Sequence, residues 1–342
     1  MRGMQAKEAA LAAVCCVILA ACGAVPQAAG SIATASPTPI ASPPAASPSP
    51  SPSPSPSESA FSPAPALPSP PPSVTGTCRV PIADISEAKG WFITIPGGSR
   101  QDDPASVVAL PGGTPGQIGA NPGLTYDLAT GTWVPVPYHW LAPGGSLYAY
   151  EGYSNSIIRA VNVVDGSNAA VVTGGGWLLM TTADDGVYVT KSDAPGAWFI
   201  PFGGQPRLVI DHGSWQRLSN GYLWGVDASG NLVRHDMIGG GEMTWATVPA
   251  SAWIVGFDPL GNPLVNRGGA LLLVQAGNSI TTLWPGTSGS VGGRAAGDAR
   301  GIWFEVGGGL VGAPGHGLYL WTAAAGAHLI SSDEGNLAGG CS

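Results

Sequence analysis

A regular spacing of tryptophan residues limits most strongly what this chain can fold into. Three of them follow one another at intervals of 38 residues, namely Trp177, Trp215 and Trp253. Trp140 precedes this set by 37 residues, while Trp91 and Trp303 lie about 50 residues outside it, where glycine-rich insertions account for the extra length. Units of this size cannot bury their apolar faces singly, so neighbouring units must pack side by side. The spacing therefore predicts six repeated segments.

Each segment contains several short runs of strand-forming residues separated by turns. In the fourth segment the expected strands are 214–218, 222–226, 231–235 and 243–248. In the fifth they are 253–257, 263–266, 271–275 and 280–284. The turn Asp227-Ala-Ser-Gly-Asn231 has the same Asp-x-x-Gly-Asn pattern as Asp258-Pro-Leu-Gly-Asn262. In such a turn the Asp side chain caps backbone amides while Gly adopts a positive φ, so the chain returns as a hairpin.

Four-stranded units at this period predict an all-β fold, a six-bladed β-propeller over residues 78–342 whose inward strands line a central channel. A ring of five or seven blades, or a β-sandwich with an extra hairpin domain, remains open as an alternative. No convincing amphipathic helix follows residue 78. The Gly-Gly-Gly stretches at 174–176, 239–241 and 307–309 lie between strands and are expected to be turns.

The first residues have the pattern of an export signal. Arg2 and Lys7 give a basic start, and 9–21 is an uncharged run of thirteen residues, shorter than the roughly 20 needed to span a bilayer. The sequence Leu19-Ala-Ala-Cys22-Gly23 resembles the bacterial lipobox. This resemblance implies that signal peptide 1–21 is cleaved and that lipid on Cys22 tethers the protein to the cell membrane, on its extracytoplasmic side. Alternatives are an ordinary signal peptide cut after Ala21 or near residues 28–29, or an uncleaved anchor.

Residues 22–77 form a linker rich in Pro, Ser and Ala, with a Ser-Pro alternation from 46 to 57. Nothing in it can bury a core, so we expect an extended, disordered spacer with polyproline II bias, reaching on the order of 100–150 Å. A proline-rich ligand for a partner domain is the alternative.

The cysteines agree with this division. Cys22 would carry lipid, which leaves Cys78 and Cys341 at opposite ends of the folded region. In an oxidising compartment these two are expected to form a disulfide that joins the first and last strands, the alternative being two free thiols.

One segment resembles a kelch repeat. Its Gly112-Gly113 pair is followed by Tyr126-Asp-Leu-Ala-Thr-Gly-Thr-Trp133, and a glycine pair, a Tyr and a Trp recur at about this spacing in kelch repeats. The other segments match poorly. The resemblance supports the propeller architecture and carries over no partner or activity.

Net charge and side-chain chemistry exclude fewer functions than the repeat pattern excludes folds. The chain has 13 Lys and Arg against 21 Asp and Glu, a net charge of −8, which disfavours binding to nucleic acid.

Turn capping is the expected role for most carboxylates that we considered for sugar hydrolysis: Asp102, Asp103, Asp184, Asp185, Asp236, Glu305, Asp333 and Glu334. Among five scattered histidines, His139 and His212 are the pair most worth testing as metal ligands, although edge or loop positions are expected. No catalytic residue, metal or cofactor is assigned.

Together these observations predict a lipid-anchored, extracytoplasmic binding or scaffolding module for an envelope protein or glycan. This function rests on analogy at the level of the fold and on the lack of catalytic motifs in the sequence, because propellers host many unrelated activities. The first alternative is an envelope hydrolase, lyase or oxidoreductase with its site at the channel mouth, which an acidic or His-lined funnel with shifted pKa values would favour. An apolar or aromatic open face would favour binding. The third possibility is a structural envelope lipoprotein.

Overall fold

The computed structural model describes residues 77–84, 87–111, 123–152, 157–227, 229–248, 251–287, 289–307, 316–333 and 335–342. Within these ranges the regular elements are β-strands and two 3₁₀ turns, η1 (Pro104–Ser106) and η2 (Tyr138–Trp140). The expected signal peptide, Cys22 and the linker up to residue 76 lie outside the described residues. Across the described ranges, no helix is both long and apolar enough for a membrane span.

The described strands form seven antiparallel sheets. The first contains β1 (Cys78–Asp84), β2 (Lys89–Ile95), β3 (Arg100–Asp103) and the C-terminal β25 (Asn336–Leu337). The second contains β4 (Thr125–Asp127) and β5 (Thr132–Val134), and the third β6 (Leu147–Glu151), β7 (Ile157–Asn162) and β8 (Asn168–Thr173). The fourth contains β9 (Trp177–Ala183), β10 (Gly186–Lys191), β11 (Ala194–Pro201) and β12 (Arg207–Ile210).

Three further four-stranded sheets follow. The fifth contains β13 (Ser214–Ser219), β14 (Tyr222–Val226), β15 (Asn231–Asp236) and β16 (Glu242–Thr247). The sixth contains β17 (Trp253–Phe257), β18 (Pro263–Arg267), β19 (Ala270–Gln275) and β20 (Ser279–Trp284). The seventh contains β21 (Ser290–Asp298), β22 (Gly301–Gly307), β23 (Gly317–Thr322) and β24 (Gly326–Ser331).

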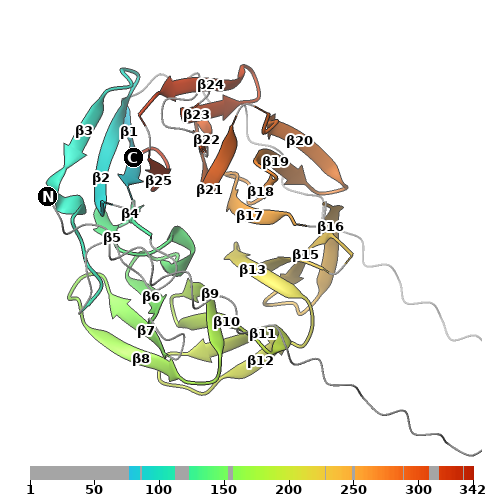
Figure 1. Ribbon diagram of the computed structural model, residues 1–342. Helices are drawn as coiled ribbons and strands as arrows, with labels where there is room; N and C mark the ends of the chain where they lie inside the picture. Colours follow the sequence, from blue (N-terminus) through green and yellow to red (C-terminus); the bar gives the residue numbers. More distant parts are fainter. Residues whose placement is uncertain are drawn as a thin grey trace, which may run out of the picture. The chain divides into compact units, whose positions relative to one another are not determined.

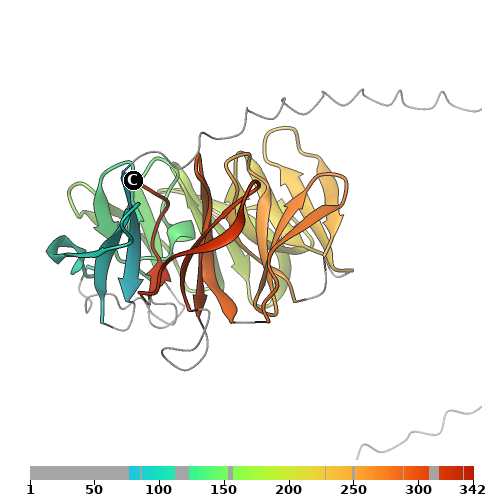
Figure 2. The same cartoon turned by 90° about the horizontal axis from the view of Figure 1, so that it is seen from above.

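The sheets stand side by side around a central axis. Figure 1 shows β13, β17, β21 and β25 near the middle of the ring, with β3, β8, β16, β20 and β24 at its rim. In the perpendicular view of Figure 2 the blades form one band of neighbouring sheets. Successive inner strands contact one another from β9 to β13, β17, β21 and β25. This arrangement is a β-propeller, so the all-β fold class predicted from the sequence is confirmed.

The tryptophan spacing indicated six blades, whereas the described residues hold seven sheets, a number that was among the alternatives. The difference arises because the six marker tryptophans are not equivalent. Those at 38-residue intervals do lie on inner strands β9, β13 and β17. Trp140, however, belongs to η2, Trp303 lies on the second strand of its sheet counted from the centre, and Trp91 lies on the third. The short β4–β5 sheet falls between two of these markers.

The N- and C-terminal segments close the ring. The C-terminal strand β25 pairs with β1, placing Ile82 opposite Leu337. Beside this pair the backbones of Arg79 and Ser342 exchange hydrogen bonds of 3.1 and 2.9 Å. A disulfide joins Cys78 to Cys341 over a sequence separation of 263 residues. The disulfide between Cys78 and Cys341 that the sequence predicted is therefore present, with Cys78 in β1 and Cys341 in the segment that follows β25.

The hydrophobic core lies between adjacent sheets. One cluster joins Tyr188 and Phe199 of the fourth sheet to Trp215 and Leu223 of the fifth. Another joins Val255 and Leu264 of the sixth sheet to residues of the seventh. Each blade thus buries its apolar face against its neighbours, which is why short strands of this kind are stable only as a ring.

The two Asp-x-x-Gly-Asn turns have the geometry expected from the sequence. Asp227 Oδ1 accepts the backbone N–H of Asn231 at 2.8 Å, and Asp258 Oδ1 accepts that of Asn262 at 2.7 Å. Gly261, which completes the second turn, has a φ of +81°. The Asn231 side chain, followed by backbone amides, holds the pKa of Asp227 below its usual range. Identical turn chemistry therefore forms two different hairpins, β14–β15 and β17–β18.

Candidate ligand site in the central channel

A small cavity of about 170 Å³ lies where several sheets meet near the centre of the ring. Its walls come from strands β4, β21, β22 and β25 and from η2, which are far apart in the sequence. The polar side chains among its lining residues are Thr125, Tyr138, His139, Arg294, Glu305 and Asn336. A channel built from the inner edges of several blades is the place where propellers bring distant residues together.

The turn η2 carries Tyr138 and His139 to this cavity. Its last residue, Trp140, is 2% exposed, and its indole Nε1 donates to the backbone carbonyl of Leu179 at 3.3 Å. The Thr182 hydroxyl in turn donates to the Trp140 carbonyl at 2.7 Å. Because Trp140 is fixed against β9, the two residues before it line the cavity.

Arg294 reaches the cavity through an irregularity in β21. The register of β21 against β22 shifts between Val291 and Ala295, so Gly292, Gly293 and Arg294 lie outside the regular ladder. A bulge of this kind bends the strand and redirects a side chain. Arg294 donates from one terminal nitrogen to the Ala338 carbonyl, and this bond fixes its guanidinium at the closing segment of the ring.

Arg217 stands on β13, where the register shifts between Trp215 and Arg217. Its guanidinium donates to the Gln216 carbonyl at 2.8 Å. The inner strands β9, β13, β17 and β21 each carry such a register shift in their pairing with the second strand. The bulges are therefore a recurrent feature of the channel wall.

Both Arg217 and Arg294 approach the ring of Tyr138. The guanidinium carbon of Arg294 is 4.5 Å from the centre of the Tyr138 ring, and that of Arg217 is 5.8 Å from it. Cations over an aromatic face are attracted by its quadrupole, so the ring holds both side chains nearby. None of the described ion pairs includes either arginine.

Burial sets the charge states around this ring. Desolvation, followed by the positive charges of Arg217 and Arg294, holds the pKa of His139 well below its usual value, so the imidazole is neutral. Desolvation also lowers the pKa of Arg294 to about 10, which leaves it cationic at neutral pH. The result is a locally positive site inside a protein with a net charge of −8.

Several polar atoms here are buried and have no hydrogen-bond partner within the described part of the protein. They are Tyr138 Oη, His139 Nδ1, Arg217 Nε, Arg294 Nε and Glu305 Oε1. Buried polar groups are nearly always paired, because an unpaired one costs about 1–3 kcal/mol. Such a concentration of unpaired groups in one place is a feature of binding sites more than of structural cores.

Glu305 connects the channel cavity with a larger pocket of about 400 Å³. The Glu305 side chain is 5% exposed, and desolvation raises its pKa well above the usual value, only partly opposed by the Leu337 amide. The larger pocket also contains Asp84, His316 and Asp333. Its lining is thus acidic and includes a histidine, as the enzyme alternative requires.

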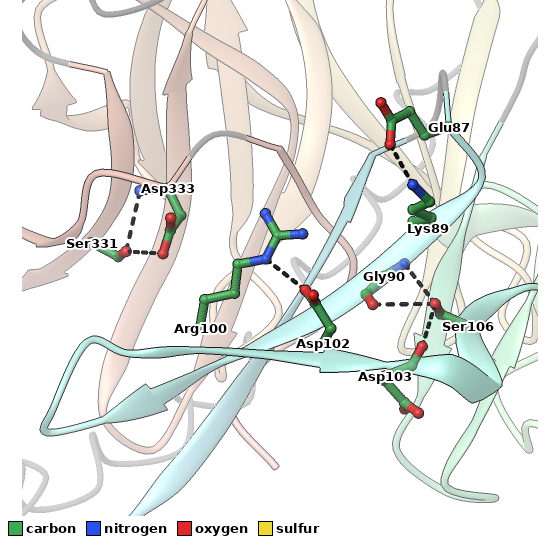
Figure 3. Close-up of polar contacts among 9 residues, drawn as sticks. All are labelled: Glu87, Lys89, Gly90, Arg100, Asp102, Asp103, Ser106, Ser331 and Asp333. Atoms are coloured by element: carbon green, nitrogen blue, oxygen red, sulfur yellow. Dashed lines mark hydrogen bonds and ion pairs between the residues drawn. The ribbon is translucent and has the colours of Figure 1, made fainter.

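Most of the other carboxylates considered from the sequence make hydrogen bonds or ion pairs in turns or at the surface. Asp102 pairs with Arg100 at 2.6 Å, and Asp333 Oδ2 lies 3.0 Å from the Ser331 hydroxyl (Figure 3). Asp103 caps η1 through the amide of Ala105. Asp184 accepts the Gly144 amide at 3.0 Å, and Asp236 accepts the amides of Ile238 and Gly239 at 2.9 Å. Glu334 lies outside the described residues. Turn and surface contacts thus account for the members just described, except that Asp333 also lines the larger pocket beside Glu305.

The two histidines selected from the sequence have different environments. His139 lies in the channel, whereas His212 is exposed and lies 2.8 Å from Asp211 and 2.9 Å from Glu242. Hydrogen bonds to Asp211 and then Glu242 raise the pKa of His212. In the ranges that the structure describes, no group of three or more His, Cys, Asp or Glu side chains is placed to hold a metal ion.

Tyr138, Arg217 and Arg294 were missed by sequence reasoning. Two signals bear on them. Arginine and lysine are scarce in this chain, 13 in 342 residues, so an Arg inside a strand-forming run is unusual. The string Gly292-Gly293-Arg294 also interrupts β21, and glycine inside a strand pattern marks a bulge. Neither signal shows that the residues meet at one place.

Comparison with known proteins gives structural likenesses only. No protein-family model and no curated protein matches the chain. Similar solved structures are a nidogen/laminin complex (11% identity, TM-score 0.43, 77% of this chain and 97% of that chain) and TolB from Acinetobacter baumannii (11%, 0.45, 74% and 62%). A third is the dihydro-heme d1 dehydrogenase NirN in complex with DHE (13%, 0.43, 75% and 64%). The chain thus spans less than two thirds of the last two, and the likenesses assign it neither ligand nor activity.

Proposed function

We propose that this chain is a lipid-anchored binding module of the bacterial envelope that takes its ligand in the channel of its propeller. The observation that carries the binding role is the group of five buried, unpaired polar atoms around Tyr138 and Glu305. A ligand that satisfies these atoms recovers the free energy that their burial costs. The lipobox-like sequence ending at Cys22 supports the anchor and the extracytoplasmic position.

The anchor is tested by lipid labelling in a bacterial host. Wild-type protein is expected in the membrane fraction with incorporated labelled palmitate, and Cys22→Ser is expected to lose both, because the thiol that receives the lipid is gone. Cys15→Ser, within the expected signal peptide, is the matched control and keeps the label. Palmitate label that persists in Cys22→Ser would show that this tether does not exist.

The place of binding is tested by filling the channel. Gly293 lines the cavity, and a Cβ added there meets no atom within 4 Å, so Gly293→Phe adds a ring without a backbone clash. We expect immobilised residues 22–342 carrying Cys22→Ser to capture a defined protein or glycan from envelope extract, and Gly293→Phe to lose that capture. Gly241→Phe, at an equally open glycine between β15 and β16, is the control. Equal capture by both variants would place binding elsewhere.

The acidic pocket favours a second candidate, an envelope enzyme. A buried carboxyl with a raised pKa, such as Glu305, is suited to act as a general acid. Turnover in a panel of glycoside, peptide and ester substrates that is abolished in Glu305→Gln would support the enzyme and overturn the binding role. A complete lack of turnover together with specific capture would support binding.

A further inference from the structure

We infer that the channel holds an oxyanion, the carboxylate or phosphate group of its ligand, between the guanidinium groups of Arg217 and Arg294. The inference rests on the proposed binding function and names the chemistry that the site recognises.

The unpaired groups beside Tyr138 are mainly hydrogen-bond donors. The Nε atoms of Arg217 and Arg294 each carry one N–H with no partner in the described protein, and Tyr138 has a free hydroxyl. A guanidinium group presents its donors in a planar fork that matches two oxygens of a carboxylate or phosphate. A site whose unpaired groups are mostly donors favours a ligand rich in acceptor oxygens.

The two positive charges also lack compensation. Both guanidinium carbons lie within 6 Å of one aromatic ring, at 4.5 and 5.8 Å from its centre, and neither arginine belongs to a described ion pair. Two cations that approach the same ring, with neither in a described ion pair, repel each other through a partly buried environment of lowered dielectric constant. An anion placed between them converts this repulsion into two attractions.

The surrounding groups do not oppose a bound anion. His139 is neutral, and one of its tautomers offers a further donor from the unpaired Nδ1. Glu305 also lines the cavity, and the raised pKa of its buried carboxyl favours the uncharged form. Thr125, the remaining hydroxyl among the lining residues, already donates to the Val136 carbonyl at 2.7 Å.

Other arginines of the chain provide a contrast. Arg234 lies between Tyr222 and Trp245, 4.2 and 4.3 Å from their ring centres, on the outer part of the fifth sheet. Its guanidinium is thus also held by aromatic rings, but these are not Tyr138, and Arg234 is not among the unpaired groups beside that ring. Arg234→Gln therefore removes an aromatic-stacked arginine without touching the proposed site.

The test is isothermal titration calorimetry at low ionic strength. The protein is residues 22–342 carrying Cys22→Ser, titrated with inorganic phosphate and, in a separate experiment, with succinate. We expect one site for at least one of these anions. Arg217→Gln and Arg294→Gln should each weaken it by about tenfold or more, since a charge-assisted hydrogen bond and an ionic attraction are lost. Arg234→Gln should leave the affinity unchanged.

Each outcome is decisive. A preference for phosphate points to a phosphorylated ligand, and a preference for succinate to a carboxylate ligand, and both support the inference. If neither phosphate nor succinate binds, or if Arg234→Gln lowers the anion affinity as much as Arg217→Gln and Arg294→Gln do, the inference is overturned. Because Arg294 also binds the Ala338 carbonyl, thermal unfolding of each variant is recorded, and Arg217→Gln carries the test if Arg294→Gln is unstable. Capture of envelope material that persists in both channel variants would refute the anion site and leave the binding function standing.

Discussion

Replacing both Cys78 and Cys341 by serine is expected to lower the free energy of unfolding by about 3–5 kcal/mol. The cross-link spans 263 residues, and in the chain-entropy model the stabilisation grows with the length of the closed loop. The last strand, β25, contributes only two residues to the first sheet, and backbone hydrogen bonds such as those between Arg79 and Ser342 complete the closure beside the disulfide.

The measurement is urea unfolding of residues 22–342 carrying Cys22→Ser, with and without the two substitutions. Added reductant should lower the unfolding midpoint of the parent and leave that of the double variant unchanged, because only the parent has a bond to reduce. Identical midpoints for the two proteins, or two free thiols in the parent, would refute the stabilising cross-link.

A second large loss of stability is expected for Trp303→Ala, about 3–5 kcal/mol. The Trp303 side chain is fully buried, at 0% exposure, and its Nε1 donates to Asp298 Oδ2 at 2.7 Å. The same carboxylate oxygen accepts the Cys341 amide at 3.1 Å. Truncation therefore leaves a large cavity beside the closure of the ring and removes one partner of a shared hydrogen-bond acceptor.

Trp253→Ala is the matched control, because Trp253 belongs to the same tryptophan series but its side chain is 46% exposed. Surface substitutions of this kind usually change stability by less than about 0.5–1 kcal/mol. Denaturant unfolding of the two variants measures the difference directly. Equal losses would mean that position in the repeat, and not burial, sets the contribution of these tryptophans.

The sequence predicted the fifth and sixth sheets almost strand by strand. Alternating apolar residues and the two Asp-x-x-Gly-Asn turns are local signals, and both turns form as expected. The disulfide closure was also predicted, from the positions of Cys78 and Cys341 together with the export that the lipobox resemblance implies, with two free thiols as the alternative. The strand β25 could not be predicted, because Asn336–Leu337 is too short to show a strand pattern.

Burial of the repeat tryptophans was only partly predictable. The regular spacing suggests that these tryptophans pack between blades; Trp215 is 4% exposed and Trp177 9%, in line with such packing, whereas Trp253 is 46% exposed. Spacing reports the position of a residue within a blade. Its exposure depends on what the adjacent blade places against it, which the sequence of one segment does not contain.

The channel site was beyond sequence reasoning for a different reason. Tyr138 sits in a 3₁₀ turn, and Arg217 and Arg294 sit beside register shifts on two inner strands. These residues are 79 and 77 positions apart in the chain and approach one another only because the blades form a ring. Local pattern predicts strands, whereas this convergence depends on closure.

The most direct test of the channel site is a crystal structure of residues 22–342 carrying Cys22→Ser, soaked in selenate. Selenate is a tetrahedral dianion whose selenium scatters anomalously, so its position is measured independently of the protein. We expect an anomalous peak between the guanidinium groups of Arg217 and Arg294, next to Tyr138. Selenate bound at surface positions, with no peak between these two arginines, would contradict a ligand site at the centre of the propeller.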